Sequence, residues 1–172
     1  MQKITPCMWF DREAEQAMLF YTEIFAGRPG RPNGESKIIS IKRYPDGPLE
    51  EPMKGMEGQV ITGIFLLDGQ KFMCLDGGPI FKPNEAWSLE VDCADQAEVD
   101  YFWEKLSQGG DESAQQCGWL KDKFGFSWQI VPRALLELLN HPDKATADRV
   151  LQAMLKMKKL DVDGLEAAAN NA

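Results

Sequence analysis

Histidine is almost absent from this sequence, and its four cysteines are scattered. The chain contains one histidine, His141, and no Cys-x-x-Cys pair, so it offers neither a histidine-rich metal site nor a zinc-ribbon or thioredoxin motif. His141 stands just before Pro142, which is typical of a helix start rather than of a catalytic base. We expect no metal and no other cofactor, and we interpret the cysteines as reduced, mostly buried residues.

Long apolar runs and an excess of positive charge are lacking as well. No run approaches the ~20 apolar residues of a membrane span, and the first residues lack the apolar core of a signal peptide. We therefore expect a cytoplasmic protein with no membrane contact. Lys and Arg number 19 against 27 Asp and Glu, and the net charge of -8 argues against nucleic-acid binding. With 44% hydrophobic and 10% aromatic residues, the composition is that of a folded globule.

The first half of the sequence predicts one helix and four strands. Asp11 is a good N-cap for a helix that ends at Gly27, and apolar residues recur on one face of that segment. Asp68-Gly69 between two apolar runs is the strongest short hairpin signal. A Pro- and Gly-rich loop at 45–58 is expected to shape a binding site or a partner contact. The expected order is a strand (3–10), a helix (12–26) and three strands (37–44, 60–67 and 70–76).

The second half repeats this order in a shorter form. Gly77-Gly78-Pro79 breaks the chain, and Asp95 then caps a helix at 96–107, with Glu98 completing a capping box. Strands are expected at 86–93, 115–121 and 126–131. The aromatic pair Phe20-Tyr21 recurs as Phe102-Trp103, 82 positions later in the chain, which indicates an internal duplication.

The sequence after Pro132 reads as helical. Segments 133–139, 143–158 and 161–169 are expected to form helices, and the middle one carries an apolar stripe that includes Val150, Leu151 and Leu155. Two interpretations of the stripe remain open: a helix packed on the sheet, or a contact between two copies of the chain.

Three motifs together resemble one known family. They are ITPCMWFDREAEQAMLFY (4–21), CGWLKDKFGFSWQIVP (117–132) and RVLQAMLKMKKLDVDGLEAA (149–168). They resemble the PhnB-like family, often labelled 3-demethylubiquinone-9 3-methyltransferase, of the glyoxalase/bleomycin-resistance (vicinal oxygen chelate) superfamily.

The resemblance implies an α+β fold in which two βαβββ modules form a curved eight-stranded sheet. The modules are expected at 1–79 and 80–132, and a helical C-terminal extension at 133–172. The resemblance also implies a homodimer. Methyl transfer is not expected, because the chain lacks the glycine-rich strand-to-helix turn that binds the methyl donor in typical methyltransferases.

The resemblance also implies where a metal would be held. Metal-dependent members use mainly His and Glu on the first and last strands of each half. The corresponding positions here carry Thr5, Cys7, Cys74, Asp76, Ser88, Glu90 and Gln129. The expected histidines are absent, and Gln is a poor ligand for a transition metal.

These observations favour metal-independent binding of a small, mainly apolar molecule in the barrel cavity. Apolar walls with a few polar groups are typical of such a pocket. No catalytic residue is assigned, and it stays open whether the protein is an enzyme. The alternatives are a divalent-metal-dependent lyase, isomerase or dioxygenase, and a dimeric interaction protein without a ligand. The expected pocket residues are Thr5, Cys7, Trp9, Phe65, Met73, Cys74, Trp87, Ser88, Glu90, Trp119, Lys121, Trp128 and Gln129.

Overall fold

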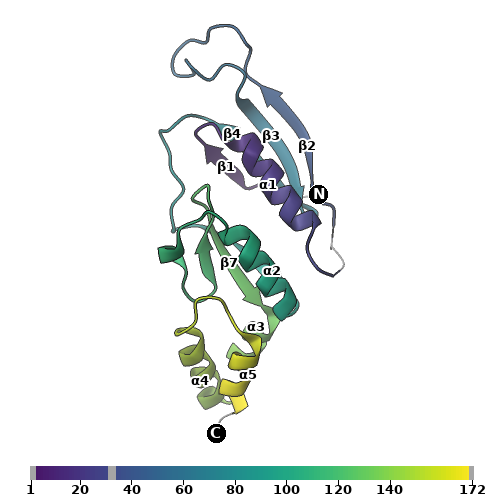
Figure 1. The fold of residues 1–172 in the computed structure, drawn as a ribbon, viewed down its shortest axis with the longest axis vertical. Helices are drawn as coiled ribbons and strands as arrows, with labels where there is room; N and C mark the ends of the chain where they lie inside the picture. Colours follow the sequence, from purple (N-terminus) through teal and green to yellow (C-terminus); the bar gives the residue numbers. More distant parts are fainter. Residues whose placement is uncertain (1–2, 31–33, 171–172) are drawn as a thin grey trace. The chain divides into compact units, whose positions relative to one another are not determined.

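The chain folds into two compact units, Met1–Pro83 and Asn84–Ala172. The structure is a computed structural model that describes residues 3–30 and 34–170. Figure 1 shows that each unit combines a β-sheet with one long helix lying across it. Within the described residues, no helix combines the length and the apolar character needed to cross a membrane.

The first unit is a complete βαβββ module. Its sheet has the order β1-β4-β3-β2, with β1 parallel to β4 and the other neighbours antiparallel. The predicted hairpin turn is confirmed, because Asp68 and Gly69 adopt φ values of 49° and 82° between β3 and β4. The elements are β1 (Cys7–Phe10), α1 (Ala14–Ala26), β2 (Lys37–Arg43), β3 (Val60–Leu67) and β4 (Gln70–Asp76).

Helix α1 packs on one face of this sheet and forms the core of the unit. Alternate strand residues such as Met8 and Phe72 are buried against apolar residues of α1 such as Met18. Gly63 permits the close approach: a Cβ there would lie 2.6 Å from Sδ of Met18 and 2.7 Å from Sγ of Cys74. The opposite face of the sheet is not covered by a helix of this unit (Figure 1).

The start of α1 differs from the prediction. The helix begins at Ala14, its N-cap residue Glu13 makes no side-chain cap, and the expected cap by Asp11 is wrong. The carboxylate of Asp76 takes that role instead: one oxygen accepts from the Ala14 amide at 2.9 Å and the other from the Val60 amide at 3.0 Å. A buried carboxylate with two such donors joins the helix to two strands.

The second unit contains a smaller sheet of three strands. Its order is β5-β7-β6, with β5 parallel to β7 and β6 antiparallel to it. The predicted cap of α2 by Asp95 is confirmed, because its carboxylate accepts from the Glu98 amide at 3.0 Å. The carboxylate of Glu98 accepts in turn from the amide of Ala94, one residue before the N-cap, at 2.7 Å. The elements are β5 (Ser88–Cys93), α2 (Gln96–Ser107), the 3-10 helix η1 (Glu112–Ala114), β6 (Trp119–Lys121) and β7 (Ser127–Pro132).

The expected eight-stranded sheet is therefore wrong. The described residues form two sheets of four and three strands. Between α2 and β6 the chain forms η1 and a single β-bridge, which joins Gln116 and Trp119. The second unit thus lacks a counterpart of β2, and the strand expected at 115–121 shortens to 119–121.

Three C-terminal helices complete the second unit. They are α3 (Arg133–Leu139), α4 (Lys144–Met154) and α5 (Val162–Asn170). Their core cluster consists of Val131, Leu135, Val150, Leu160 and Leu165. The apolar stripe of α4 is thus partly a core contact, since Val150 is buried whereas Leu151 is exposed.

The segment between α4 and α5 lies at the β6 edge of the second sheet, where the second unit has no counterpart of β2. The amide of Cys117 donates to the Met157 carbonyl at 2.9 Å, and the amide of Gly118 donates to the Lys158 carbonyl at 2.8 Å. These residues directly precede β6, the edge strand. The extension thus satisfies two backbone amides at the start of this edge.

Candidate functional site

Each sheet has one face that its own helix does not cover, and we call these the first and second open faces. Side chains alternate between the two faces of a strand, so the pairing register assigns each residue to a face. The first open face comprises Cys7, Trp9, Lys37, Ser40, Lys42, Thr62, Ile64, Leu66, Lys71, Met73 and Leu75. The part of the second open face relevant here comprises Ser88, Glu90, Trp119, Lys121 and Gln129.

The centre of the first open face is apolar. Cys7 pairs with Met73, which pairs with Ile64 on the next strand. Trp9 pairs with Leu75 one step further along the same strands. These five side chains form neighbouring rows, and all but the exposed Cys7 are half-buried. The arrangement is an apolar surface without a covering helix, which is unusual for a face that meets only water.

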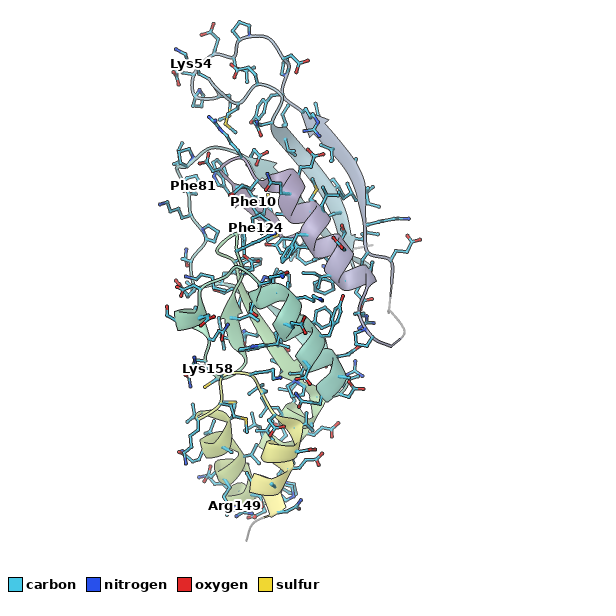
Figure 2. All side chains as sticks on the ribbon, viewed as in Figure 1. Phe10, Lys54, Phe81, Phe124, Arg149 and Lys158 are labelled. Atoms are coloured by element: carbon cyan, nitrogen blue, oxygen red, sulfur yellow. The ribbon has the colours of Figure 1, made fainter. Side chains whose placement is uncertain are left out.

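Trp9 is held in one orientation on this face. Its indole Nε1 donates to the Gly78 carbonyl at 2.9 Å, and its ring meets the Phe81 ring edge to face with centroids 4.9 Å apart. A Cβ on Gly77 would come within 2.1 Å of the indole, so only glycine fits beneath it. Phe81, labelled in Figure 2, lies in the segment after β4. Phe81 is not among the residues that the sequence predicts for the pocket, because the Gly77-Gly78-Pro79 segment before it predicts only a break in the chain.

The second open face is polar. The amide nitrogen of Gln129 donates to the Ser88 hydroxyl at 2.7 Å, and Gln129 lies opposite both Glu90 and Trp119 in the register. Lys121 at the end of β6 forms an ion pair with Glu85. The hydrogen bond from Lys121 is the main reason why the pKa of Glu85 is lowered. This face offers hydrogen-bonding groups and one aromatic ring.

Three of the residues expected in the pocket face the cores instead, and two more lie outside the strands. Phe65 and Cys74 face α1, and the Phe65 ring stacks on the Phe72 ring with centroids 5.4 Å apart. Trp128 is buried on the other side of β7 from Gln129, and its indole donates to Asp122 at 2.7 Å. These three side chains belong to the cores. Thr5 and Trp87 lie just before β1 and β5, and Trp87 is 47% exposed.

The thiols near β1 and β4 are not activated. Partial burial raises the pKa of Cys7 above its ordinary value. Burial, together with the nearby charge of Asp76, raises the pKa of Cys74 to about 12. A raised pKa keeps both thiols protonated at neutral pH, and the protonated form is a poor nucleophile and a poor metal ligand.

The side chains on the open faces do not match the His and Glu ligands that the resemblance implies for a metal site. Among residues 3–30 and 34–170, no group of three or more His, Cys, Asp or Glu side chains is placed to hold a metal ion. Glu90 stands beside Gln129, whose amide nitrogen already donates to Ser88. Asp76 is occupied by two backbone amides. We derive no chemical step through a metal.

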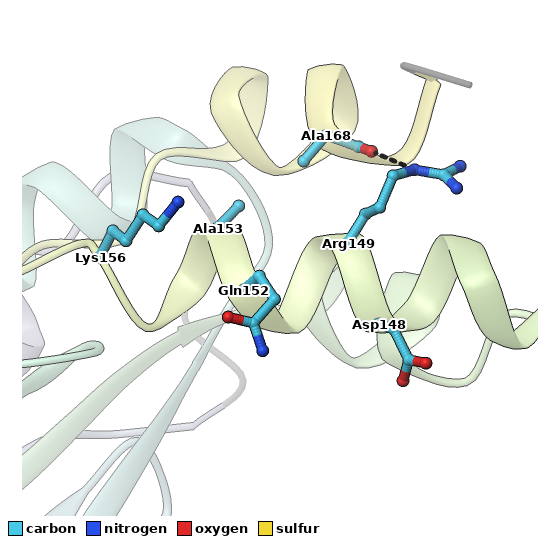
Figure 3. A pocket seen from close by; sticks show the side chains of 6 residues that line it. All are labelled: Asp148, Arg149, Gln152, Ala153, Lys156 and Ala168. Carbon is cyan, nitrogen blue, oxygen red and sulfur yellow. Dashed lines mark hydrogen bonds between the residues drawn. The ribbon is translucent and has the colours of Figure 1, made fainter.

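A shallow groove lies between α4 and α5 in the second unit (Figure 3). It measures about 360 Å³ and is lined by Asp148, Arg149, Gln152, Ala153, Lys156 and Ala168. The guanidinium of Arg149 donates to the carbonyls of Ala168 at 3.1 Å and Ala169 at 2.9 Å. Arg149 therefore caps the end of α5, a structural role.

The fold defines an α+β protein, as the sequence predicts, with a complete βαβββ module in the first unit and a module shortened by one strand in the second. The family model of 3-demethylubiquinone-9 3-methyltransferase matches residues 2–131, and the chain belongs to this family. The PhnB protein from Bacillus cereus is 38% identical, with 76% of this chain and 99% of that chain covered and a TM-score of 0.59. The predicted family is thus confirmed.

Two further solved structures are similar. Protein PA1353 from Pseudomonas aeruginosa is 16% identical over 77% of this chain and 98% of its own, with a TM-score of 0.56, which shows the shared fold alone. A glyoxylase/bleomycin resistance protein/dioxygenase domain from Frankia sp. EAN1pec is 14% identical over 77% and 92%, with a TM-score of 0.45. No curated protein matches the chain. Helices α3, α4 and α5 follow the last residue that the family model matches.

Proposed function

We propose that this protein binds a small, mainly apolar molecule without a metal, and that the first open face supplies the binding surface. The observation that carries the proposal is the fixed indole of Trp9 beside the apolar row of Cys7, Met73 and Ile64. A rigid aromatic ring loses little conformational freedom when a ligand packs on it. The residues Ser88, Glu90, Trp119, Lys121 and Gln129 of the second open face are proposed as polar ligand-binding groups of their unit.

A titration with N-phenyl-1-naphthylamine tests this proposal. This uncharged dye becomes fluorescent in apolar surroundings. We expect it to bind the wild type, and we expect Trp9→Ala to weaken binding about tenfold, because the variant loses a large aromatic contact. Circular dichroism checks that the variant is folded.

Leu19→Ala is the matched control, because Leu19 is an apolar residue of the same unit that is 55% exposed on α1. Its affinity for the dye should equal that of the wild type. Equal affinities of wild type and Trp9→Ala, or no binding at all, would contradict the proposal and leave an interaction protein without a ligand as the alternative.

Methyl transfer is not part of the proposal despite the family's description. Each sheet here contains a single parallel pair, β1 with β4 and β5 with β7, and its other pairs are antiparallel. Typical methyltransferases bind their donor at a glycine-rich turn of a doubly wound parallel sheet. The turn between β1 and α1 consists of Asp11, Arg12 and Glu13 and contains no glycine.

A further inference from the structure

An aromatic pair, Trp9 and Phe81, stands at one end of the first open face. The two ring centroids lie 4.9 Å apart, and the ring planes meet at 78°. Trp9 belongs to β1, whereas Phe81 belongs to the segment that follows β4. Two rings at nearly a right angle offer two apolar walls that meet in a corner, and both walls are aromatic.

The indole wall of this pair is fixed by the backbone. The amide of Gly77 donates to the Phe10 carbonyl at 2.9 Å, and the amide of Gly78 donates to the Asp11 carbonyl at 3.3 Å. The segment after β4 is therefore tied to the end of β1. The Gly78 carbonyl in turn accepts from the indole of Trp9 at 2.9 Å. Because the indole is held before any ligand arrives, a ligand that packs on it loses little affinity to the ordering of this ring.

The phenyl wall of the pair remains open. Phe81 is 62% exposed although its ring already contacts the indole, whereas the core residue Phe65 of the same unit is 1% exposed. Trp9 is half-buried. A ligand in the corner would thus remove a large part of the phenyl surface from water, and removal of apolar surface from water is favourable.

We propose that the ligand of the first open face is a planar aromatic compound, and that Phe81 is a binding residue that contacts it together with Trp9. This inference rests on the proposed function and adds the chemical class of the ligand. A planar ring in the corner can stack on one wall and meet the other edge to face, and both geometries are favourable between aromatic rings. A saturated molecule gains only from apolar contact. A saturated molecule and a second copy of the chain are the competing occupants.

Two uncharged alcohols with the same carbon skeleton separate aromatic recognition from simple apolar binding. The ring system of 2-naphthalenemethanol is planar and aromatic, and that of its decahydro counterpart is saturated and puckered. Each alcohol competes with N-phenyl-1-naphthylamine for the wild type. We expect the aromatic alcohol to displace the dye at about tenfold lower concentration. The hydrophobic effect alone predicts the opposite order, because the saturated alcohol has more apolar surface.

Phe81→Leu tests the phenyl wall, because leucine keeps an apolar side chain there and removes the ring. The variant should bind the aromatic alcohol about threefold more weakly than the wild type does and the saturated alcohol equally well. The affinity of the dye is measured separately for each variant, so that the displacement curves give dissociation constants for the alcohols. Circular dichroism checks that the variant is folded.

Phe20→Leu is the matched control. Phe20 is a half-buried residue of the same unit, and its ring meets the Tyr21 ring edge to face with centroids 5.6 Å apart. It belongs to α1, which packs on the opposite face of the sheet from Trp9. The control thus removes a comparable aromatic contact away from the first open face, and both alcohols should bind it as they bind the wild type.

The outcomes distinguish this inference from the proposed function. Displacement of the dye by the saturated alcohol at equal or lower concentration overturns the aromatic ligand and leaves apolar binding standing. A Phe81→Leu variant that keeps the full preference of the wild type overturns the role of Phe81. Absence of dye binding by the wild type overturns both proposals. Dye affinities that fall as the protein concentration rises assign the face to a second copy of the chain and also overturn the inference.

Discussion

At the scale of single residues, Asp76 shows how a sequence pattern can mislead about function. The residue ends β4 at a position where the resemblance places a metal ligand, and it is 1% exposed. Its two oxygens accept from the amides of Ala14 and Val60, so the carboxylate fixes the start of α1 and of β3. Both oxygens of this buried carboxylate are thus engaged by backbone amides, and its role is structural.

Cys74 gives a prediction about pH at this scale. Burial raises the pKa of its thiol from 9.0 to about 12, so the folded state favours the protonated form more than the unfolded state does. This contribution to stability is present below pH 9 and is lost as the pH rises from 9 towards 12, at up to ~1.4 kcal/mol per pH unit. Cys74→Ala lacks it.

Urea unfolding at about pH 8 and about pH 10.5 measures the effect. The wild type should lose about 1–2 kcal/mol more free energy of unfolding over this interval than Cys74→Ala does. Titrations of other groups occur in both proteins and cancel in the difference. Equal losses in the two proteins would show that the thiol titrates alike in the folded and unfolded states.

At the scale of elements, the C-terminal extension replaces a strand. Gly118 adopts a φ of 84°, and a Cβ there would lie 2.9 Å from Cδ1 of Leu160, so the extension approaches the edge of β6 closely. Further bonds link Gln96 of α2 to the Leu160 carbonyl at 3.2 Å and to the Val162 amide at 2.8 Å. The extension is thus part of the second unit's core and not an appended tail.

Leu160→Ala tests this role. Leu160 is 0% exposed in the cluster that joins the extension to Val131 of β7. Its truncation should cost about 2–5 kcal/mol of the free energy of unfolding, because it leaves a cavity that its neighbours fill only in part. Urea unfolding measures the difference.

The matched control for Leu160→Ala is Leu155→Ala, in the same segment. Leu155 is 48% exposed, so its truncation should change the free energy of unfolding by less than about 0.5 kcal/mol. A loss for Leu160→Ala as small as that of the control would mean that the extension does not stabilise the second unit.

At the scale of the whole molecule, we expect a homodimer. Several large apolar side chains are exposed, among them Ile4 at 85%, Ile80 at 67% and Phe81 at 62%. The edge strands β1, β2 and β5 also favour association, because a strand edge that no neighbouring strand pairs with tends to recruit another strand. Sedimentation velocity should give twice the chain mass of 19.4 kDa. A species of one chain mass at all concentrations would contradict the expectation.

The sequence by itself determined the features that depend on neighbouring residues and on periodicity. Asp68-Gly69 sets the turn between β3 and β4, and Asp95 with Glu98 caps α2, because the interacting groups lie within four positions of each other. The motifs at 4–21, 117–132 and 149–168 together indicated the family, which the family model confirms over residues 2–131.

Only the tertiary structure decided which groups meet across long separations in the chain. Asp76 caps a helix that begins 62 positions earlier, and Gly77 and Phe81 fix an indole at position 9. The extension occupies an edge where repetition of the first module predicted a strand. Such pairings depend on sheet order and on the face to which each side chain points, and neither is encoded in local spacing. For the same reason Phe65, Cys74 and Trp128 lie in the cores, while Trp9 and Met73 share an open face.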